Sequence, residues 1–130
     1  MEAWWFTDSN IEKLFIPNTV RELEKYAFFN CKKLREVVFE PGSRLETIGE
    51  YCFSCCGLED MVIPKSVWEI ESKAFSCCHN LCSLVFEKGS QLISVGKDAF
   101  SYTKLSKKNV RFLSTAQING ENNGLLNGAW

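Results

Sequence analysis

Cysteine and histidine are the residues of this 130-residue sequence whose types and spacing could support chemistry. The chain has seven cysteines, and five of them cluster around the only histidine, His79. The five are Cys52, Cys55, Cys77, Cys78 and Cys82. Thiolate and imidazole groups are preferred zinc ligands, and a thiol beside a base can act as a nucleophile. A zinc or redox site is therefore one hypothesis for the function.

The elements that must position these residues are set by an internal repeat. Ile-Pro-Asn-Thr-Val at 16–20 returns as Ile-Pro-Lys-Ser-Val at 63–67, and Phe-Glu-Pro-Gly-Ser at 39–43 returns as Phe-Glu-Lys-Gly-Ser at 86–90. Both pairs are 47 residues apart. The interval splits into two coils, because the leading apolar residues are spaced by 23, 24, 23 and 24 positions. These leading residues are Ile11, Leu34, Leu58, Leu81 and Leu105.

Each coil opens with an apolar residue, a second one three places later and a third two places after that, as in Ile11, Leu14 and Ile16. This is the strand pattern of leucine-rich repeats. It predicts a right-handed solenoid of the α/β type, mostly β, with a parallel strand face and about four full repeats at 11–104. We expect 1–10 to form a half-coil or cap, with Trp5 in the place that Phe28 takes in the first coil. We expect 105–130 to hold a degenerate last strand and an Asn/Gly-rich tail, and an uncapped stack to self-associate end to end.

The repeat also accounts for the cysteines. Cys31, Cys56 and Cys78 fall in one inward column, and Cys52 takes the place of an inward alanine. Free cysteine packs as a small apolar residue, so we expect a buried, reduced cysteine ladder. Parallel side chains about 4.8 Å apart are poorly placed for disulfides, and stacked thiols do not converge tetrahedrally on zinc. His79 aligns with Lys32 and is expected on an exposed turn, so no catalytic residue, metal ligand or cofactor is assigned.

Several in-phase motifs carry a family resemblance. They are the two Ile-Pro-x-x-Val segments, Ile48-Gly49, Val95-Gly96, and the Ala-Phe-x-x-Cys runs at 27–31 and 74–78. Through them, residues 11–105 resemble the BspA-like, or treponemal-type, leucine-rich repeats. The resemblance implies a curved, non-catalytic solenoid used for protein contact, in a family that includes surface proteins associated with adhesion. Cys52 departs from the alanine that the family pattern favours.

Charge and hydropathy narrow the remaining function classes. The formal net charge is −1, so no overall positive field favours nucleic-acid binding. The residues at 1–10 lack the basic and apolar regions of a secretory signal, and no stretch is long and apolar enough for membrane insertion. Read by itself the sequence suggests the cytoplasm, whereas the family resemblance implies the cell surface.

The candidate binding residues lie where a leucine-rich repeat exposes its strand face. In each coil the two residues flanking the second apolar anchor point outward. They are Lys13 and Phe15, Glu36 and Val38, Asp60 and Val62, Ser83 and Val85. One outward column is thus apolar throughout, which indicates either a contact surface or simple strand propensity. Trp68, on another side of the coil, is a further candidate because exposed tryptophan often anchors interfaces.

The sequence therefore predicts a protein-interaction module that uses the strand face to bind a protein partner and carries no enzymatic activity. Two alternatives stay open at this point. One is a cysteine-based zinc or redox site on adjacent coils, and the other is a fragment of a longer structural solenoid.

Overall fold

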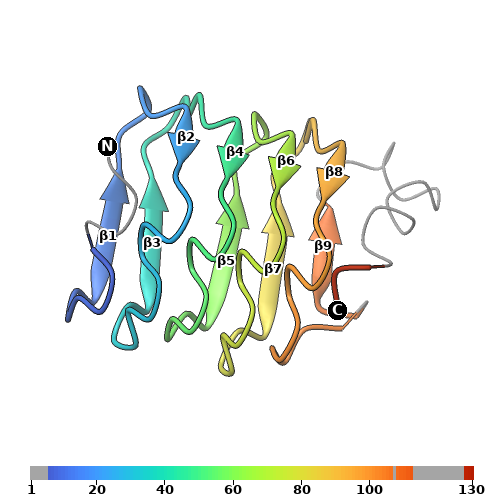
Figure 1. Ribbon diagram of the computed structural model, residues 1–130. Helices are drawn as coiled ribbons and strands as arrows, with labels where there is room; N and C mark the ends of the chain where they lie inside the picture. The colour runs from blue at the N-terminus through green and yellow to red at the C-terminus, as the bar shows by residue number, and fades with distance from the viewer. Residues whose placement is uncertain (1–5, 107, 113–127) are drawn as a thin grey trace.

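The structure is a computed structural model that describes residues 6–106, 108–112 and 128–130, and it is a parallel β-solenoid (Figure 1). Each full coil contains one long strand and one short strand joined by turns, and no helix occurs among the described residues. The long strands are β1 (Lys13–Ile16), β3 (Glu36–Phe39), β5 (Asp60–Ile63), β7 (Ser83–Phe86) and β9 (Val110–Phe112). The short strands are β2 (Glu22–Leu23), β4 (Thr47–Ile48), β6 (Glu69–Ile70) and β8 (Ser94–Val95). The predicted solenoid is confirmed.

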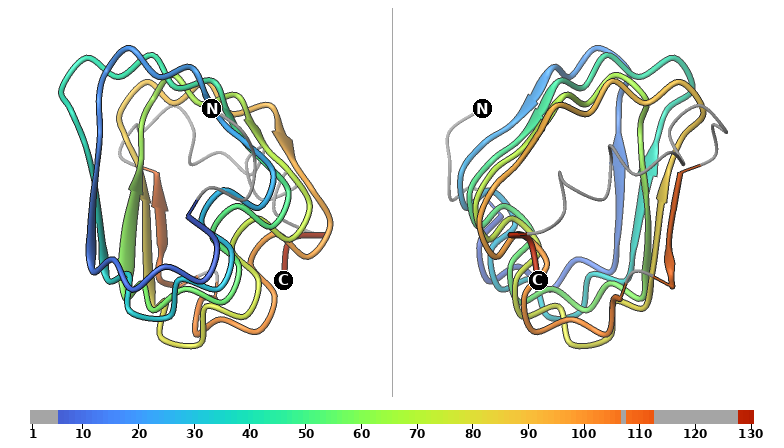
Figure 2. Two further views of the ribbon diagram at one scale, coloured as in Figure 1. Left: turned by 60° about the vertical axis from the view of Figure 1, so that its left-hand side comes forward. Right: turned by 90° about the vertical axis from the view of Figure 1, so that its right-hand side faces the viewer.

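The two kinds of strand lie on different sides of the coil. Viewed along the stack, the long strands line one side of the coil and the short strands another (Figure 2). Apolar side chains from both kinds of strand form the buried core. Strand alternation explains this core, because Met61 and Ile63 are buried while Val62 between them is exposed. The same inward positions recur from coil to coil and stack into continuous columns.

A column of aromatic rings runs along the stack. Phe28, Phe53, Phe75 and Phe100 stack nearly parallel, with ring centroids 5.3–5.4 Å apart. At the N-terminal end Phe6 stacks on Phe28 at 5.3 Å. The sequence comparison had aligned Trp5 with this column, and Trp5 lies outside the described residues. Phe6 takes the phenylalanine position instead.

The C-terminal residues extend two columns at the other end. The amide of Phe100 donates to the Ala129 carbonyl at 2.7 Å, and Ala129 is fully buried beyond Ala99. The Trp130 ring lies 6.1 Å from the Phe100 ring, tilted by 40°. Ala129 and Trp130 thus take the places of an alanine and a phenylalanine in a further coil. Most of the predicted tail, 113–127, lies outside the described residues.

The stack is divided on its long-strand side. The short strands form one sheet in the order β2-β4-β6-β8, whereas the long strands form two separate sheets, β1-β3 and β5-β7-β9. We call the gap between β3 and β5 the seam. The Glu40 amide donates to the Ile16 carbonyl in the preceding coil at 3.0 Å, and the Glu87 amide donates to the Ile63 carbonyl at 3.2 Å. The equivalent residue at the seam is Pro64, which has no amide hydrogen. One rung of the ladder to Phe39 is therefore impossible.

Each pair of coils has further internal contacts. The Glu40 carboxylate accepts a hydrogen bond from the Asn18 amide at 2.8 Å, and Glu87 repeats this contact with Lys65 at 2.9 Å. Gly49 also lies against the preceding coil so closely that a Cβ would come within 2.6 Å of backbone. The structural unit is therefore the 47-residue coil pair seen in the sequence.

Candidate functional site

Eight of the nine predicted binding residues lie together on the long strands. The parallel register places Lys13 opposite Glu36 and Phe15 opposite Val38 in the first sheet. It places Asp60 opposite Ser83 and Val62 opposite Val85 in the second. The solenoid therefore assembles the predicted apolar stripe and the polar column beside it.

The apolar stripe is accessible along its length. Phe15 is 57% exposed and Val62 is 46% exposed, while Val38 and Val85 are half-buried. The stripe ends at Arg111, which lies opposite Val85 in β9 and is exposed. In the polar column Lys13 lies 3.7 Å from Glu36, a pair that is too exposed to hold either side chain firmly.

The seam opens a groove in this face. The groove has a volume of about 310 Å³ and combines an apolar floor with carboxylates and no basic side chain. Its lining consists of Glu36, Val37, Val38, Phe39, Asp60, Val62, Pro64 and Glu87. We call it the seam groove. It contains four predicted residues, Glu36, Val38, Asp60 and Val62, so the predicted site and the break in the sheet coincide.

Sequence reasoning missed the other four lining residues. Val37 and Phe39 were expected to be buried anchors, but both are half-buried because no strand pairs with this edge of β3. Their counterparts in the third coil, Met61 and Ile63, are fully buried. The available signal was Pro64, since proline at a strand end interrupts a ladder.

The BspA type leucine rich repeat region matches residues 2–122 in six copies. The chain belongs to the BspA-type leucine-rich repeat family. Six copies fit the four full coils together with the partial coils that Phe6 and Val110 mark at either end. Solenoids of this family are typically non-catalytic binding scaffolds.

Among solved structures, this BspA-type chain is similar to the crystal structure of the pneumococcal vaccine antigen PcpA. The TM-score is 0.59 at 20% sequence identity, and the match covers 75% of this chain and 31% of that one. The likeness supports the fold. The chain thus spans about a third of the length of that protein, and no curated protein matches it.

Trp68, the ninth predicted residue, lies apart from the others. It directly precedes β6 on the short-strand side of the BspA-type solenoid and is 38% exposed. The next coil places Ile93 beside it, with the Ile93 amide donating to the Trp68 carbonyl at 2.9 Å, and Ile93 is 68% exposed. The two side chains make a small second apolar patch.

The cysteine ladder occurs as predicted. Cys31, Cys56 and Cys78 are buried, and each thiol donates to the carbonyl of a phenylalanine in the preceding coil, at 2.9, 3.2 and 3.0 Å. All seven cysteines are free. Burial raises the pKa of Cys78 to about 12 and raises that of Cys52 further. Cys52 and Cys78 are therefore packing groups with little thiolate character at neutral pH, whereas the hydrogen bond with Cys56 lowers the pKa of Cys31.

No group of three or more metal-binding side chains is placed to hold an ion anywhere in 6–106, 108–112 or 128–130. That range includes all the cysteines and His79, which is exposed on its turn as expected. The zinc alternative therefore has no supporting geometry.

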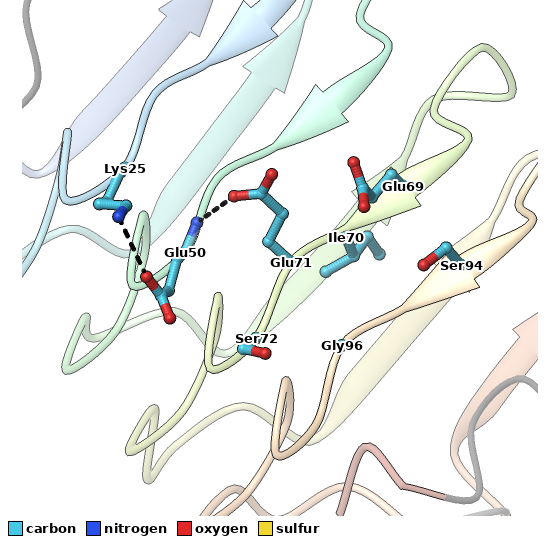
Figure 3. A pocket seen from close by; sticks show the side chains of 8 residues that line it. All are labelled: Lys25, Glu50, Glu69, Ile70, Glu71, Ser72, Ser94 and Gly96. Atoms are coloured by element: carbon cyan, nitrogen blue, oxygen red, sulfur yellow. Dashed lines mark hydrogen bonds and ion pairs between the residues drawn. The ribbon is translucent and has the colours of Figure 1, made fainter.

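A second hollow, of about 450 Å³, lies on the short-strand side (Figure 3). Figure 3 shows two of its three carboxylates engaged in structural contacts: Glu50 pairs with Lys25 at 3.4 Å, and Glu71 accepts from the Glu50 amide at 3.0 Å. The small residues Ser72 and Gly96 leave the space open. This hollow is more polar than the seam groove and contains only one apolar side chain, so it is the weaker candidate for a protein contact.

Proposed function

We propose that the chain is a non-catalytic protein-interaction module that binds its partner on the long-strand face, with the seam groove at the centre of the contact. The observation that carries this proposal is the coincidence of the apolar stripe with a groove whose floor is apolar. Interfaces combine such apolar centres with polar rims.

The charge of the groove specifies the partner further. Glu36, Asp60 and Glu87 supply three carboxylates, and no lysine or arginine lines the same space. Glu36 also lies 3.7 Å from Lys13 outside the groove, and Glu87 also accepts a hydrogen bond from the Lys65 amide. Such a rim complements a cationic side chain and disfavours an acidic one. We therefore propose a partner segment that presents lysine or arginine next to apolar residues. The aliphatic part of a lysine or arginine side chain can pack on the valines of the groove floor while its charged end pairs with the carboxylates at the rim.

The proposal is testable with a displayed library of random peptides selected against the full chain. We expect selected peptides to be enriched in lysine or arginine beside apolar residues. Val62→Glu and Asp60→Lys should each weaken their binding about tenfold or more, which corresponds to about 1.4 kcal/mol. Ile93→Glu, the same kind of substitution at an exposed position on the short-strand side, is the control and should leave binding unchanged.

The outcome that would contradict the proposal is a set of peptides whose binding Ile93→Glu abolishes while Val62→Glu and Asp60→Lys leave it intact. Enrichment of acidic peptides would equally overturn the partner class. Circular dichroism of each variant establishes that the solenoid is folded before binding is compared.

We place adhesion at the cell surface within the same proposal, supported by the family resemblance and by the likeness to a vaccine antigen. Among the described residues there is no helix with the length and hydrophobicity needed to cross a bilayer. Antibody labelling of intact cells tests the location: labelling only after permeabilisation would overturn it. End-to-end self-association also stays a prediction, to be tested by sedimentation.

A further inference from the structure

Cys55 and Cys77 occupy equivalent corner positions on the two coils that flank the seam. Both have left-handed backbone conformations, with φ of 62° and 59°. The Cys55 amide donates to the Ser76 carbonyl at 2.9 Å, which makes the two corners direct neighbours in the stack. Unlike the buried ladder, both side chains are half-exposed.

The two thiols share one hollow. It has a volume of about 420 Å³ and is bordered by Lys32 and His79, while Gly57 between them contributes no side chain. Solvent and small molecules can therefore reach both sulfur atoms. Partial burial raises the pKa of Cys77, and the neighbouring Cys55 thiol, through its charge and a hydrogen bond, raises it further. The two cysteines thus line the same space on neighbouring coils.

We propose that Cys55 and Cys77 form a redox-active dithiol that closes reversibly into a disulfide between the second and third coils, by exchange with a small-molecule disulfide. One thiol loses its proton to solvent and attacks the small disulfide, forming a mixed disulfide and releasing one small thiolate. The second thiol, also deprotonated, attacks the protein sulfur and displaces the other small thiolate. The protein loses two electrons and two protons, and the small disulfide becomes two thiols.

The backbone spacing is compatible with this bond. Neighbouring coils are about 4.8 Å apart, within the Cα separation of about 4.4–6.8 Å found across disulfides. Parallel side chains must bring their Cβ atoms about 1 Å closer to reach about 3.8 Å. The half-exposed corners allow this approach. The thiols of the ladder, such as those of Cys56 and Cys78, are held in the core by hydrogen bonds to carbonyls.

The disulfide would cross-link the solenoid at the seam, where the long-strand sheet is interrupted. β3 and β5 do not pair with each other across the seam, so a disulfide between Cys55 and Cys77 adds a cross-link between the two coil pairs. A disulfide between Cys55 and Cys77 closes the chain between them into a loop, and such a cross-link lowers the conformational entropy of the unfolded chain. We expect the oxidised protein to melt at least about 5 °C higher than the reduced protein.

The experiment incubates the full chain with oxidised glutathione, blocks the remaining thiols and maps the cysteines by mass spectrometry after trypsin. Cleavage at Lys65 and Lys73 separates the peptides 45–65 and 74–88, which carry the two cysteines. We expect these peptides to be linked through Cys55 and Cys77, as located by fragmentation, while the exposed Cys82 carries glutathione. Dithiothreitol should reverse both changes.

Cys55→Ser and Cys77→Ser should each abolish the link and leave glutathione on the partner cysteine, whereas Cys82→Ser, the matched control, should leave the link intact. Glutathione on both Cys55 and Cys77 of the same molecule would overturn the proposal. So would a vicinal bridge from Cys55 to Cys56, or an absence of linkage at a glutathione concentration that fully modifies Cys82.

Discussion

Gly96 lies so close to Ser72 in the preceding coil that a Cβ on Gly96 would come within 2.3 Å of the Ser72 amide nitrogen. Gly49 has the same relationship to Lys25 one coil pair earlier, at 2.6 Å. In both cases the glycine belongs to the second coil of a pair. The alternation of 23-residue and 24-residue coils therefore depends on close backbone contact at these glycines as well as on the apolar core.

Replacing this glycine should destabilise the fold. Gly96→Ala forces backbone atoms of two coils apart, and we expect it to lower the free energy of unfolding by at least about 2 kcal/mol. Urea denaturation followed by circular dichroism measures the change. Gly128→Ala is the matched control, because nothing lies within 4 Å of the added methyl group, and its effect should be small. Equal effects of the two substitutions would contradict the assigned close approach.

Removing the hydrogen bond between the Lys65 amide and the Glu87 carboxylate should destabilise the fold less than Gly96→Ala does. Glu87→Ala leaves the Lys65 amide without its acceptor, and we expect a loss of about 1 kcal/mol in unfolding free energy. Glu87→Gln keeps a side-chain oxygen in place and should stay within about 0.5 kcal/mol of the original chain. A loss as large for glutamine as for alanine would show that charge, rather than the hydrogen bond, is responsible.

The aromatic column should dominate stability. Phe75 is fully buried between Phe53 and Phe100, so Phe75→Ala leaves a cavity and should cost about 3–5 kcal/mol. Phe15→Ala removes the same group from the exposed stripe and should cost about 0.5 kcal/mol or less. Thermal unfolding of both variants gives the comparison. A similar cost for the two would show that Phe15 also packs into the core.

Stability should fall at alkaline pH. Burial raises the pKa of Cys78 from 9.0 to about 12, so the folded chain keeps a proton that the unfolded chain releases from about pH 9. The stabilisation is complete below pH 9 and is lost progressively between pH 9 and 12, by up to about 1.4 kcal/mol per pH unit. Unfolding measured from neutral pH to about pH 11 should show a shallower decline for Cys78→Ala. A slope unaffected by Cys78→Ala would contradict the prediction.

The sequence was sufficient to predict the columns because the same residue types recur at fixed intervals. The buried positions of Cys31, Cys52 and Phe53 follow from that periodicity alone. The seam was not predicted because it arises between coils: Pro64 interrupts a ladder only when its position relative to Phe39 is known. Ala129 and Trp130 were missed because the regular spacing of apolar residues fails after Leu105, so their positions in a further coil could not be aligned with the earlier ones.

Strand alternation explains why the candidate site was predicted in part. Side chains such as Val38 and Val62 point outward by strand alternation, which a sequence shows directly. The groove between them depends on how far two strands separate, and that separation is a property of three-dimensional packing.

The missing rung at Pro64 also gives the solenoid an uneven resistance to force. Each coil pair is held by a long-strand ladder on one side and a short-strand ladder on the other. The junction between the pairs lacks the long-strand ladder and is held by the short-strand ladder, the turn contacts, the stacked Phe53 and Phe75 rings and side-chain hydrogen bonds such as that of Glu71 to the Glu50 amide. A molecule pulled along its stack should therefore extend first at this junction, while each coil pair stays intact.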